Sequence, residues 1–499
     1  MNRQQLAPWL LFIAIAAIYL LFPTRSYYWD GIVFAQAIED ATSLNPSLVH
    51  PNHLIYNFAG YLFYKLLYSL GTEIRALTAL QILNSILSAA CARIFFSILL
   101  DTLRSLYFAV CLTLIFAFSA TWWKFSTDAN AYIPSVLFLL ISFYLVLPNR
   151  KVRPLLLAVT FFIGLAFHQL AVVMWPVLAL GVYLQDGPLS IKQRVLNAFY
   201  FTAVAGVLIV ATYSYLFYLA SGAFDLQRLL SWTASYSPDA DTRFGLWSNL
   251  QYSLRGQVRL FFGGRLNLLK GLVNPLVVLL IAALVSAAGL VLFNALRSLA
   301  TAILIGRGPK LRLETRQKTV LLLSLLWTFA YLVFLYFWLP QNTFYRIFYL
   351  PGLVLLLGLL LSAVQNRASK SRTLAMFVIA VALANFLFLI YPFSHVEKYP
   401  PLSFALQMNR EWPAGTVIYY GAQNSDQQLV RYFNPSTQWK QLRPESITAP
   451  GDSAWLETTA IDQISSTAAG AQWLNTRARK DSLKELNDGA YRIRFIQVY

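Results

Sequence analysis

Long runs of apolar residues dominate the chain from its start to residue 392. A helix needs about 20 apolar residues to cross the hydrocarbon core of a bilayer. The segment 154–184 is longer than one crossing requires, and we predict two short crossings there that turn near Ala166–Gln169. The other segments predicted to cross are 7–23, 76–100, 105–121, 132–148, 197–220, 272–296, 319–339, 345–364 and 373–392.

Basic residues cluster in short segments between these apolar runs, which is the pattern that orients helices in a membrane. If every cluster faces the cytoplasm, an even number of crossings separates each cluster from the next. The apolar stretch 53–70 must then stay on one side, and its Tyr and Lys residues predict an interfacial helix. The result is about 11 crossings, with a cytoplasmic N-terminus and an extracytoplasmic C-terminus. The clusters are Arg3, Arg104, Arg150–Arg153, Lys192–Arg194, Arg297–Lys318 and Arg367–Arg372.

Three outer segments, 24–75, 221–271 and 393–499, are too long to be simple turns, and long loops on one face commonly carry function. The last of them is much more polar. Thr416–Gly421 and Ala490–Tyr499 read as strands and Asp426–Phe433 as a helix. We therefore predict an all-α polytopic domain over 1–392 and a small extracytoplasmic α/β domain over 393–499.

Composition supports a membrane protein. Of 499 residues, 58% are hydrophobic and 12% are charged, whereas a soluble protein carries about 25% charged residues. The net charge of +18 is explained by membrane orientation, so we predict lipids and no nucleic acid as partners. Cys91 and Cys111 lie in apolar runs without metal-ligand spacing, which indicates neither a disulfide framework nor a zinc site.

The first outer segment contains an acid close to the membrane. Asp30 follows the first crossing by a few residues, where a carboxylate is costly unless it has a role. It is a candidate general base, and the alternative is an N-cap for the apolar-periodic run Ile32–Ile38. His50 and His53 flank Pro51, which is placed to start a helix, and they could contact a sugar or phosphate or serve only as caps.

The histidine spacing would suit a metal, but a third ligand is not visible nearby, so we predict no metal site. No cofactor is certain, and a divalent cation stays an open alternative.

In the turn after the third crossing, Lys124 is a candidate phosphate ligand. Asp128 is a candidate second acid, and the alternative is that it caps the helix that begins near Tyr132. His168 and Gln169 at the hairpin tip either line a cavity or satisfy turn backbone.

Arginines in the outer segment 221–271 break the rule that places cations inside. Arg259 and Arg265 are candidate phosphate ligands, and contact with anionic headgroups is the competing explanation. Later, Pro340–Pro351 places Arg346 at the start of a crossing, next to Tyr345. Arg346 either snorkels or neutralises a phosphate leaving group, and Tyr345 is a candidate for the sugar pocket.

The order of these motifs resembles the GT-C superfamily of glycosyltransferases, which use polyprenyl-phosphate sugars and include protein O-mannosyltransferases and lipid A aminoarabinose transferases. The resemblance implies that Asp30 is the catalytic acid of the first loop, that Asp128 takes the second acidic position and that Arg346 contacts donor phosphate. The single acid before Gly31, and Asn52-His53 after Pro51, depart from the common pattern and leave the acceptor open. The matching segments are YYWDGIVFAQAIED, HPNHLIYN, WWKFSTDANAYIP, GLAFHQ and YRIFYLP, within residues 27–351.

The resulting hypothesis is an inverting transfer of a sugar from a polyprenyl-phosphate donor to a hydroxyl of a glycan, lipid or protein, outside a bacterial inner membrane, with Asp30 as base. The chain lacks a Gly-rich nucleotide cradle, which fits a lipid donor. One alternative is a polysaccharide polymerase or ligase that uses the basic segment 221–271. A second alternative is a lipid-linked-sugar transporter, which would need charged residues within the crossings, but only Arg93 looks embedded in one. A third alternative is a relative that binds a lipid sugar without catalysis.

Overall fold

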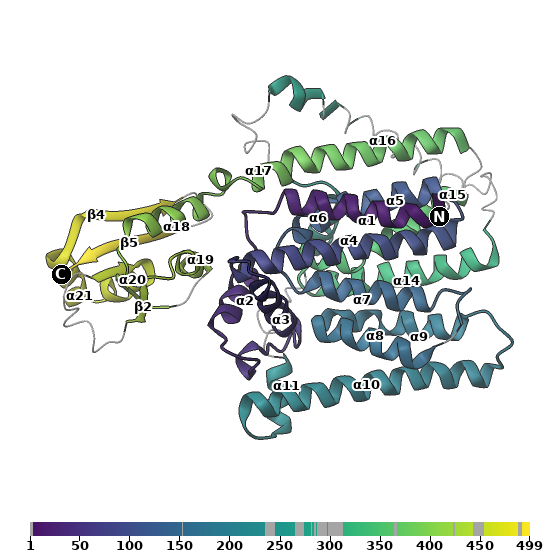
Figure 1. The fold of residues 1–499 in the computed structure, drawn as a ribbon, viewed down its shortest axis with the longest axis horizontal. Coiled ribbons are helices and arrows are strands. Elements are labelled where there is room, and N and C mark those ends of the chain that lie inside the picture. Colours follow the sequence, from purple (N-terminus) through teal and green to yellow (C-terminus); the bar gives the residue numbers. More distant parts are fainter. Residues whose placement is uncertain are drawn as a thin grey trace. The chain divides into compact units, whose positions relative to one another are not determined.

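A computed structural model divides the chain into two compact units. Met1–Pro23 and Ala37–Pro392 form the helical unit, and Thr24–Gln36 joins Phe393–Tyr499 in the C-terminal unit (Figure 1). The structure describes residues 3–151, 153–234, 245–264, 274–280, 282–283, 286, 297, 313–363, 367–422, 425–442, 454–487 and 492–499.

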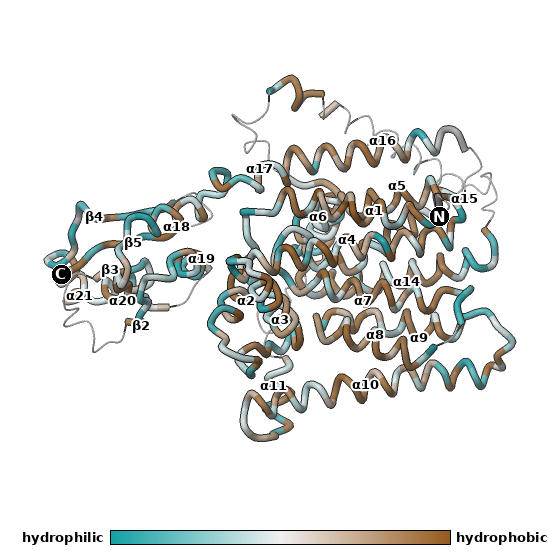
Figure 2. The backbone as a smooth tube through the Cα atoms, viewed as in Figure 1, coloured by the Kyte–Doolittle hydropathy of each residue, from teal (hydrophilic) through white to brown (hydrophobic). Residues whose placement is uncertain are grey.

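The helical unit is built almost entirely from apolar helices, which are brown along most of their length in Figure 2. The connecting short helices are η1 (Pro46–Leu48), η2 (Gln169–Met174), η4 (Phe344–Phe348) and η5 (Phe386–Ile390). The main helices are α1 (Arg3–Leu21), α3 (Tyr56–Ser69), α4 (Ala76–Leu103), α5 (Leu106–Phe118), α6 (Ala120–Ser126), α7 (Tyr132–Leu145), α8 (Pro154–Phe167), α9 (Trp175–Leu184), α10 (Ile191–Ser221), α11 (Leu226–Ala234), α12 (Leu246–Phe261), α14 (Thr315–Phe337), α15 (Leu350–Ala363), α16 (Arg367–Asn385) and α17 (Tyr391–Phe393).

Among the described residues, four helices are long and apolar enough to cross a membrane alone, and the bent pair α5–α6 adds a fifth. The four are Ala76–Leu103, Ile191–Ser221, Thr315–Phe337 and Ser371–Phe393. Shorter apolar helices occupy Gln5–Leu21, Tyr132–Leu145, Pro154–Phe167, Gln169–Leu184 and Leu350–Ala363. These helices cover the predicted crossings except 272–296, most of which lies outside the described residues. The chain is thus an integral, multi-pass membrane protein.

The predicted crossing 105–121 is not a straight helix. It breaks at Ser119, and α5 and α6 meet at 67°. The break frees backbone carbonyls that a membrane cannot hydrate, so they need partners inside the protein. The Nδ2 of the buried Asn385 donates to the Phe118 carbonyl at 2.8 Å, and the Ser119 hydroxyl donates to the Phe116 carbonyl at 2.9 Å.

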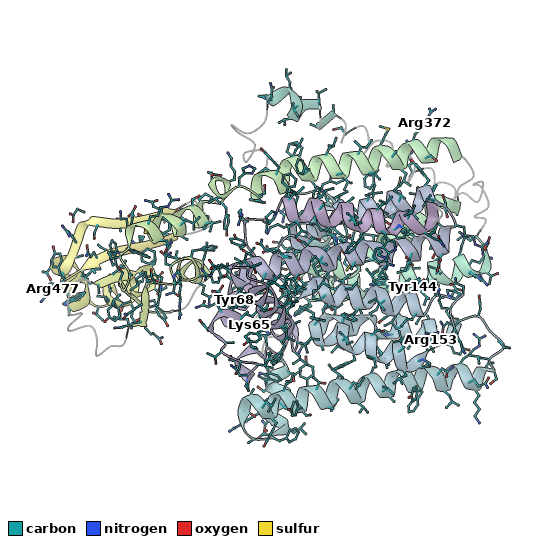
Figure 3. All side chains as sticks on the ribbon, viewed as in Figure 1. Lys65, Tyr68, Tyr144, Arg153, Arg372 and Arg477 are labelled. Atoms are coloured by element: carbon teal, nitrogen blue, oxygen red, sulfur yellow. The ribbon has the colours of Figure 1, made fainter. Side chains whose placement is uncertain are left out.

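Ion pairs join the helix ends that carry the basic clusters. Arg104 after α4 pairs with Glu314 before α14 at 3.1 Å, and Arg150 after α7 pairs with Asp101 of α4. Within the helical unit, Figure 3 places Arg153 and Arg372 at this same end of the helices, away from Lys65. Arg104, Arg150, Arg153 and Arg372 therefore share one end of the bundle, as an even number of crossings between their clusters requires.

Helix α3 has one buried face and one exposed face. A Cβ on Gly60 would come within 2.6 Å of Leu80 and 2.8 Å of Ile38, so this glycine allows close packing on α4. Leu62 and Leu66 are exposed on the other face, as expected of an interfacial helix. The expectation that Pro51 starts the helix was wrong. The helix begins at Tyr56, because the Pro51 carbonyl accepts a long-range hydrogen bond from the Tyr213 hydroxyl at 2.7 Å.

The C-terminal unit is a five-stranded sheet in the order β2-β1-β3-β5-β4, with β1 parallel to β2 and β3 and the rest antiparallel. The predicted strands near 416–421 and 490–499 and the helix near 426–433 are present. The elements are α18 (Pro400–Glu411), β1 (Val417–Tyr420), α19 (Ser425–Phe433), β2 (Gln438–Gln441), β3 (Ala454–Glu457), α20 (Thr458–Ser465), α21 (Ala468–Arg477), β4 (Ala478–Asn487) and β5 (Arg492–Val498).

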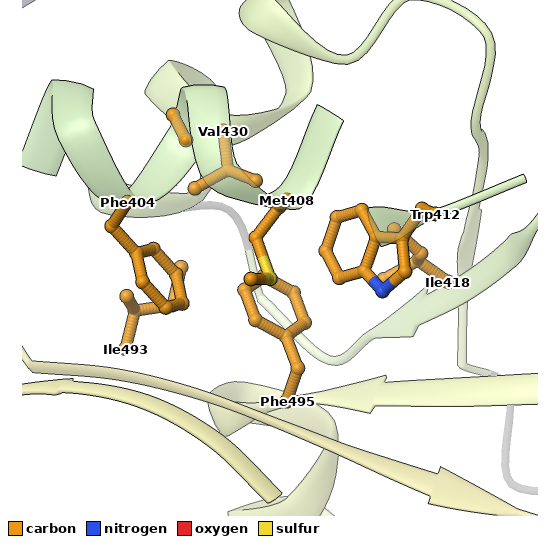
Figure 4. Close-up of a cluster of buried hydrophobic side chains, with 8 residues drawn as sticks. Phe404, Met408, Trp412, Ile418, Val430, Ile493 and Phe495 are labelled. Carbon is orange, nitrogen blue, oxygen red and sulfur yellow. The ribbon is translucent and has the colours of Figure 1, made fainter. Parts of the chain in front are cut away.

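Two apolar clusters hold the helices to opposite faces of this sheet. Phe404 and Met408 of α18 and Val430 of α19 pack on Phe495 of β5 (Figure 4). On the other face, α20 and α21 pack on β3 and on Val498. Phe495 and Val498 point to opposite faces because side chains alternate along a strand.

Candidate active site

A polar stripe on α4 holds the turn that follows α6. Gln81 Nε2 donates to the Thr127 carbonyl at 2.9 Å, and Asn84 Nδ2 donates to the Asp128 carbonyl at 2.8 Å. The Ser85 hydroxyl donates to the Ser126 carbonyl at 3.1 Å. Residues three and four apart lie on one helix face, so a single face of α4 satisfies the carbonyls of the broken helix.

This turn contains a buried ion pair. Lys124 Nζ lies 2.7 Å from Asp128 Oδ2, and the side chains are 17% and 0% exposed. Asp128 Oδ1 also accepts from the Ala129 backbone N–H at 2.9 Å. The alternative in which Asp128 caps the next helix was wrong, because Asn130 Oδ1 accepts from the backbone N–H groups of Tyr132 and Ile133. Asp128 is therefore held beside Lys124 by this pair and by the backbone of its own turn.

Three histidines from two distant segments form a cluster with Tyr132. The ring centroids of His50 and His53 are 4.9 Å apart, and those of His53 and His168 are 4.8 Å apart. Tyr132 lies 4.9 Å from His168. The Gln169 N–H donates to the Asn52 carbonyl, which ties the hairpin tip to the first loop. The structure thus brings the predicted histidines together.

The imidazoles of this cluster lie in connections between helices and are held neutral. Burial lowers the pKa of His50 to about 4 and that of His168 to about 3, and it places the pKa of His53 well below its usual value. His168 Nδ1 accepts from the Leu170 N–H at 3.0 Å, so its proton resides on Nε2. That nitrogen is buried and has no hydrogen-bond partner.

Aromatic rings line this cluster. Tyr345 stacks on Trp338 with centroids 5.3 Å apart and lies 5.7 Å from His168. Tyr132 stacks on Phe344 at 5.4 Å. Gln169, which was predicted to face the sugar, has its amide nitrogen occupied by the Pro51 carbonyl at 3.0 Å, among other acceptors. The cluster offers flat rings and neutral hydrogen-bonding groups.

Arg346 is a buried cation that no acidic side chain contacts within the described part of the chain. Its side chain is in η4, and the residue is 1% exposed. Nη1 donates to the Tyr349 hydroxyl at 3.1 Å and Nη2 to the Pro340 carbonyl at 2.7 Å, while Nε has no partner. No carboxylate among the described residues pairs with it. A buried charge without a counterion is costly, so an anionic ligand would stabilise it.

Helix α12 supports this guanidinium. A Cβ on Gly256 would lie 2.2 Å from Arg346 Nε, so the guanidinium rests against bare backbone. Gln257 Nε2 donates to the Tyr349 hydroxyl at 2.6 Å. The side chain of Arg259 is exposed on this helix, and Arg265 lies outside the described residues. The phosphate roles of Lys124, Arg259, Arg265 and Arg346 stay predictions.

Asp30 lies in the first turn of α2 (Trp29–Asp40), is partly buried and belongs to the C-terminal unit. Its role as base stays a prediction. At the other end of α2, Glu39 pairs with Arg75: Arg75 Nη2 lies 2.6 Å from Glu39 Oε2. Glu39 Oε1 also accepts from the Ala76 N–H at 2.8 Å and so caps α4.

Sequence reasoning missed the residues that build the site. The signal for the α4 stripe was present, because polar residues recur at Gln81, Asn84, Ser85 and Ser88 within an apolar crossing. Gly256 and Tyr349 gave no such signal, since only the fold brings them to Arg346.

Arg93, the cation that the sequence places within a crossing, lies 4.1 Å over the Trp9 ring. Within the described residues, no three His, Cys, Asp or Glu side chains could hold a metal ion.

No family model and no curated protein matches the chain. Two crystal structures of ArnT from Cupriavidus metallidurans are similar to this chain. The structure bound to undecaprenyl phosphate aligns with a TM-score of 0.59, and the apo structure aligns with a TM-score of 0.60. In both, 98% of this chain and 97% of ArnT are covered, at 10% identity. The chain has an ArnT-like polytopic fold. The predicted all-α polytopic architecture with a small C-terminal α/β unit is thereby confirmed.

An oligosaccharyltransferase from Archaeoglobus fulgidus, in complex with Zn and sulfate, is also similar to this chain. It is 13% identical, the alignment covers 86% of this chain and 62% of the other, and the TM-score is 0.43. At 10% identity, the ArnT alignment establishes the fold and leaves the chemistry to the residues described above.

Proposed function

We propose that this chain is a membrane glycosyltransferase that moves a sugar from a polyprenyl-phosphate donor to an acceptor hydroxyl on the extracytoplasmic side. Arg346 carries the proposal. Its guanidinium is buried, has no ion-pair partner among the described residues and is supported by Gly256 and Tyr349. A phosphate oxygen is the ligand that a guanidinium binds best. The ArnT structure bound to undecaprenyl phosphate supports a lipid phosphate as that anion.

In the proposed reaction, Asp30 accepts the proton of the acceptor hydroxyl while its oxygen attacks the anomeric carbon of the donor. The new glycosidic bond forms as the bond from that carbon to the phosphate oxygen breaks. A single direct displacement inverts the anomeric configuration. The departing polyprenyl phosphate gains negative charge, which Arg346 stabilises, with Lys124 as a further cation beside Asp128.

The histidine and aromatic cluster is the proposed sugar pocket. The neutral imidazole of His168 can donate through its Nε2–H to a sugar hydroxyl without adding charge, because its Nδ1 already accepts from Leu170. The ring of Tyr345, which meets Tyr132 edge-on and lies 5.7 Å from His168, supplies an aromatic surface beside the imidazole. The acceptor is a glycan, lipid or protein hydroxyl.

We also propose that the chain lies in a bacterial inner membrane with its N-terminus in the cytoplasm and its C-terminal unit outside. The common end of the bundle that carries Arg104, Arg150 and Arg316 supports this orientation, since short cytoplasmic loops are rich in such residues. The alternative of a polymerase or ligase would depend on the arginines of 221–271, and no described contact of Arg259 favours it.

The test is Asp30→Asn in the full-length protein in detergent or lipid nanodiscs. Transfer from a polyprenyl-phosphate sugar should fall by about 10³-fold or more, because a neutral amide cannot accept the proton. Donor binding and thermal stability should be retained. The matched control is Asp40→Asn at the exposed end of the same helix, which should transfer like the wild type. Full transfer by Asp30→Asn would remove this residue from the mechanism.

A further inference from the structure

Helix α12 runs across the end of the helical unit that lies opposite the basic clusters. Helices α14 and α16 both begin at the basic end, so their last turns lie at the opposite end (Figure 3). The last turn of α14 binds the start of α12, where Asn249 Nδ2 donates to the Tyr336 carbonyl at 3.1 Å. The last residue of α16 binds the other end of α12, where Asn385 Nδ2 donates to the Phe261 carbonyl at 2.7 Å. Because both of its ends are held at the same end of the bundle, this helix of 16 residues, about 24 Å long, runs along the membrane surface.

One face of α12 is apolar and exposed. Its residues are Trp247, Leu250, Leu254 and Val258. They follow one another at intervals of three or four residues, which places them on one side of the helix. Gly256 and Leu260 lie on a different side and are buried in the protein. On a helix that runs along a membrane surface, an exposed apolar face is embedded among lipid chains.

Two arginines of α12 lie beside this apolar face. Arg255 and Arg259 directly follow Leu254 and Val258, and each step along a helix turns by about 100°. Both arginine side chains are exposed, and neither forms an ion pair with an acid that the structure describes. Cations next to an embedded apolar face lie at the depth of the lipid headgroups. An anionic headgroup is the partner with the complementary charge.

The buried face of the same helix contacts the proposed donor site. A Cβ on Gly256 would lie 2.2 Å from Arg346 Nε, so a shift of α12 moves the surface against which this guanidinium rests. We propose that anionic phospholipids of the extracytoplasmic leaflet bind Arg255 and Arg259, and that they hold α12 in the position that supports Arg346. The inference rests on the proposed function, because it assigns a lipid partner and a form of regulation to the same site.

The expected size of the effect follows from the two charges. Each arginine near an anionic membrane surface strengthens the attraction by about 5-fold, so two arginines supply about 30-fold at most. A ligand shifts an equilibrium only by the difference between its affinities for the two states. We therefore expect anionic lipid to lower the KM for the polyprenyl-phosphate donor by about 10-fold.

The experiment compares the full-length protein in nanodiscs of phosphatidylcholine alone with the same protein in nanodiscs of phosphatidylcholine and an equal amount of phosphatidylglycerol. The donor KM is expressed as the fraction of donor in the lipid. In the wild type, this KM should be about 10-fold lower in the anionic nanodiscs. In the double variant Arg255→Gln, Arg259→Gln, the two kinds of nanodisc should give the same KM. The variant Arg255→Lys, Arg259→Lys keeps both charges and should keep the difference.

The matched control removes two exposed cations from the opposite end of the bundle. Arg153→Gln with Lys192→Gln changes the net charge equally and should respond to anionic lipid like the wild type. A response that persists in Arg255→Gln, Arg259→Gln would overturn the proposal. If this variant instead raises the donor KM equally in both kinds of nanodisc, the two arginines bind the donor itself, and the phospholipid site is refuted.

A readout without catalysis separates this proposal from the proposed function. Hydrogen exchange of the α12 backbone should be slower in anionic than in neutral nanodiscs for the wild type and for the control variant. It should not differ for Arg255→Gln, Arg259→Gln. A wild type without transfer activity would refute the proposed function alone. Equal exchange of wild-type α12 in the two kinds of nanodisc would refute the lipid site, with or without transfer activity.

Discussion

Two buried cations of the helical unit have opposite surroundings. Lys124 in α6 has its own acid, Asp128, at 2.7 Å in the following turn. Arg346 in η4 has a hydroxyl and a carbonyl but no carboxylate among the described residues. Burying a charge is expensive unless it is paired. The comparison indicates that the fold neutralises one cation itself and leaves the other to be neutralised by a ligand.

The largest effect should come from removing the unpaired cation. Arg346→Met should lower kcat/KM for transfer by about 10²-fold to 10³-fold, since a charge that stabilises the leaving phosphate is lost. Thermal stability without donor should stay equal or rise, because a desolvated charge is replaced by an apolar chain. Steady-state kinetics and melting in detergent measure both. A clear drop in melting temperature would indicate that Arg346 is a structural residue.

The paired cation should behave in the opposite way. Asp128→Asn removes the carboxylate that lies 2.7 Å from Lys124 Nζ, and breaking a largely buried pair from one side costs about 3 kcal/mol. The melting temperature of the protein should therefore fall even without donor, and Lys124→Met should restore part of it in the double variant. If Asp128→Asn melts like the wild type, the contrast between the two cations does not hold.

A smaller effect should follow from a methyl group placed beside Arg346. In Gly256→Ala, the new Cβ meets the guanidinium at 2.2 Å, and this flexible end must shift. We expect a rise in donor KM of about 10-fold with little loss of stability. Gly206→Ala in α10 is the matched control, because nothing lies within 4 Å of its Cβ. Equal kinetics in the two variants would argue against support of Arg346 by α12.

The smallest effect concerns pH, through the neutral histidines beside these cations. The pKa of His50 is lowered to about 4 and that of His168 to about 3, whereas an unfolded histidine titrates near 6.5. As pH falls from about 6.5 toward 4, the histidines of the unfolded chain become protonated while the buried imidazoles of the folded protein stay neutral. The free energy of unfolding therefore decreases over this range. The melting temperature should fall over that window, and less so in His50→Asn. A wild-type melting temperature that stays flat from pH 7 to 4.5 would contradict neutral imidazoles.

Much of the fold was readable from the sequence. Crossing segments follow from apolar length, and the basic clusters at Arg104 and Arg150 located one common end of the bundle. The strands and helix of the C-terminal unit were visible as short polar-apolar patterns. The site was only partly readable. His50, His53 and His168 were candidates for the sugar pocket, and they do lie together. The side-chain amide of Gln169, another candidate, donates to the Pro51 carbonyl instead.

The errors share a cause. Asp128 and Asn130 are both reasonable caps by composition, and only the turn geometry set by Gln81 and Asn84 decides between them. Pro51 looks like a helix start, but its carbonyl is taken by Tyr213 from far along the chain. Each choice depends on a partner that sequence spacing does not reveal.

By itself, the sequence determined which segments lie in the membrane, because transfer of an apolar helix from water depends on its own residues. It also supplied the acid, histidine and arginine chemistry of the candidate site. Only the tertiary structure decided which charge is paired, which carbonyl is satisfied and where a glycine admits a guanidinium. Those outcomes depend on contacts between residues far apart in the chain, and a buried charge or carbonyl is stable only if such a contact forms.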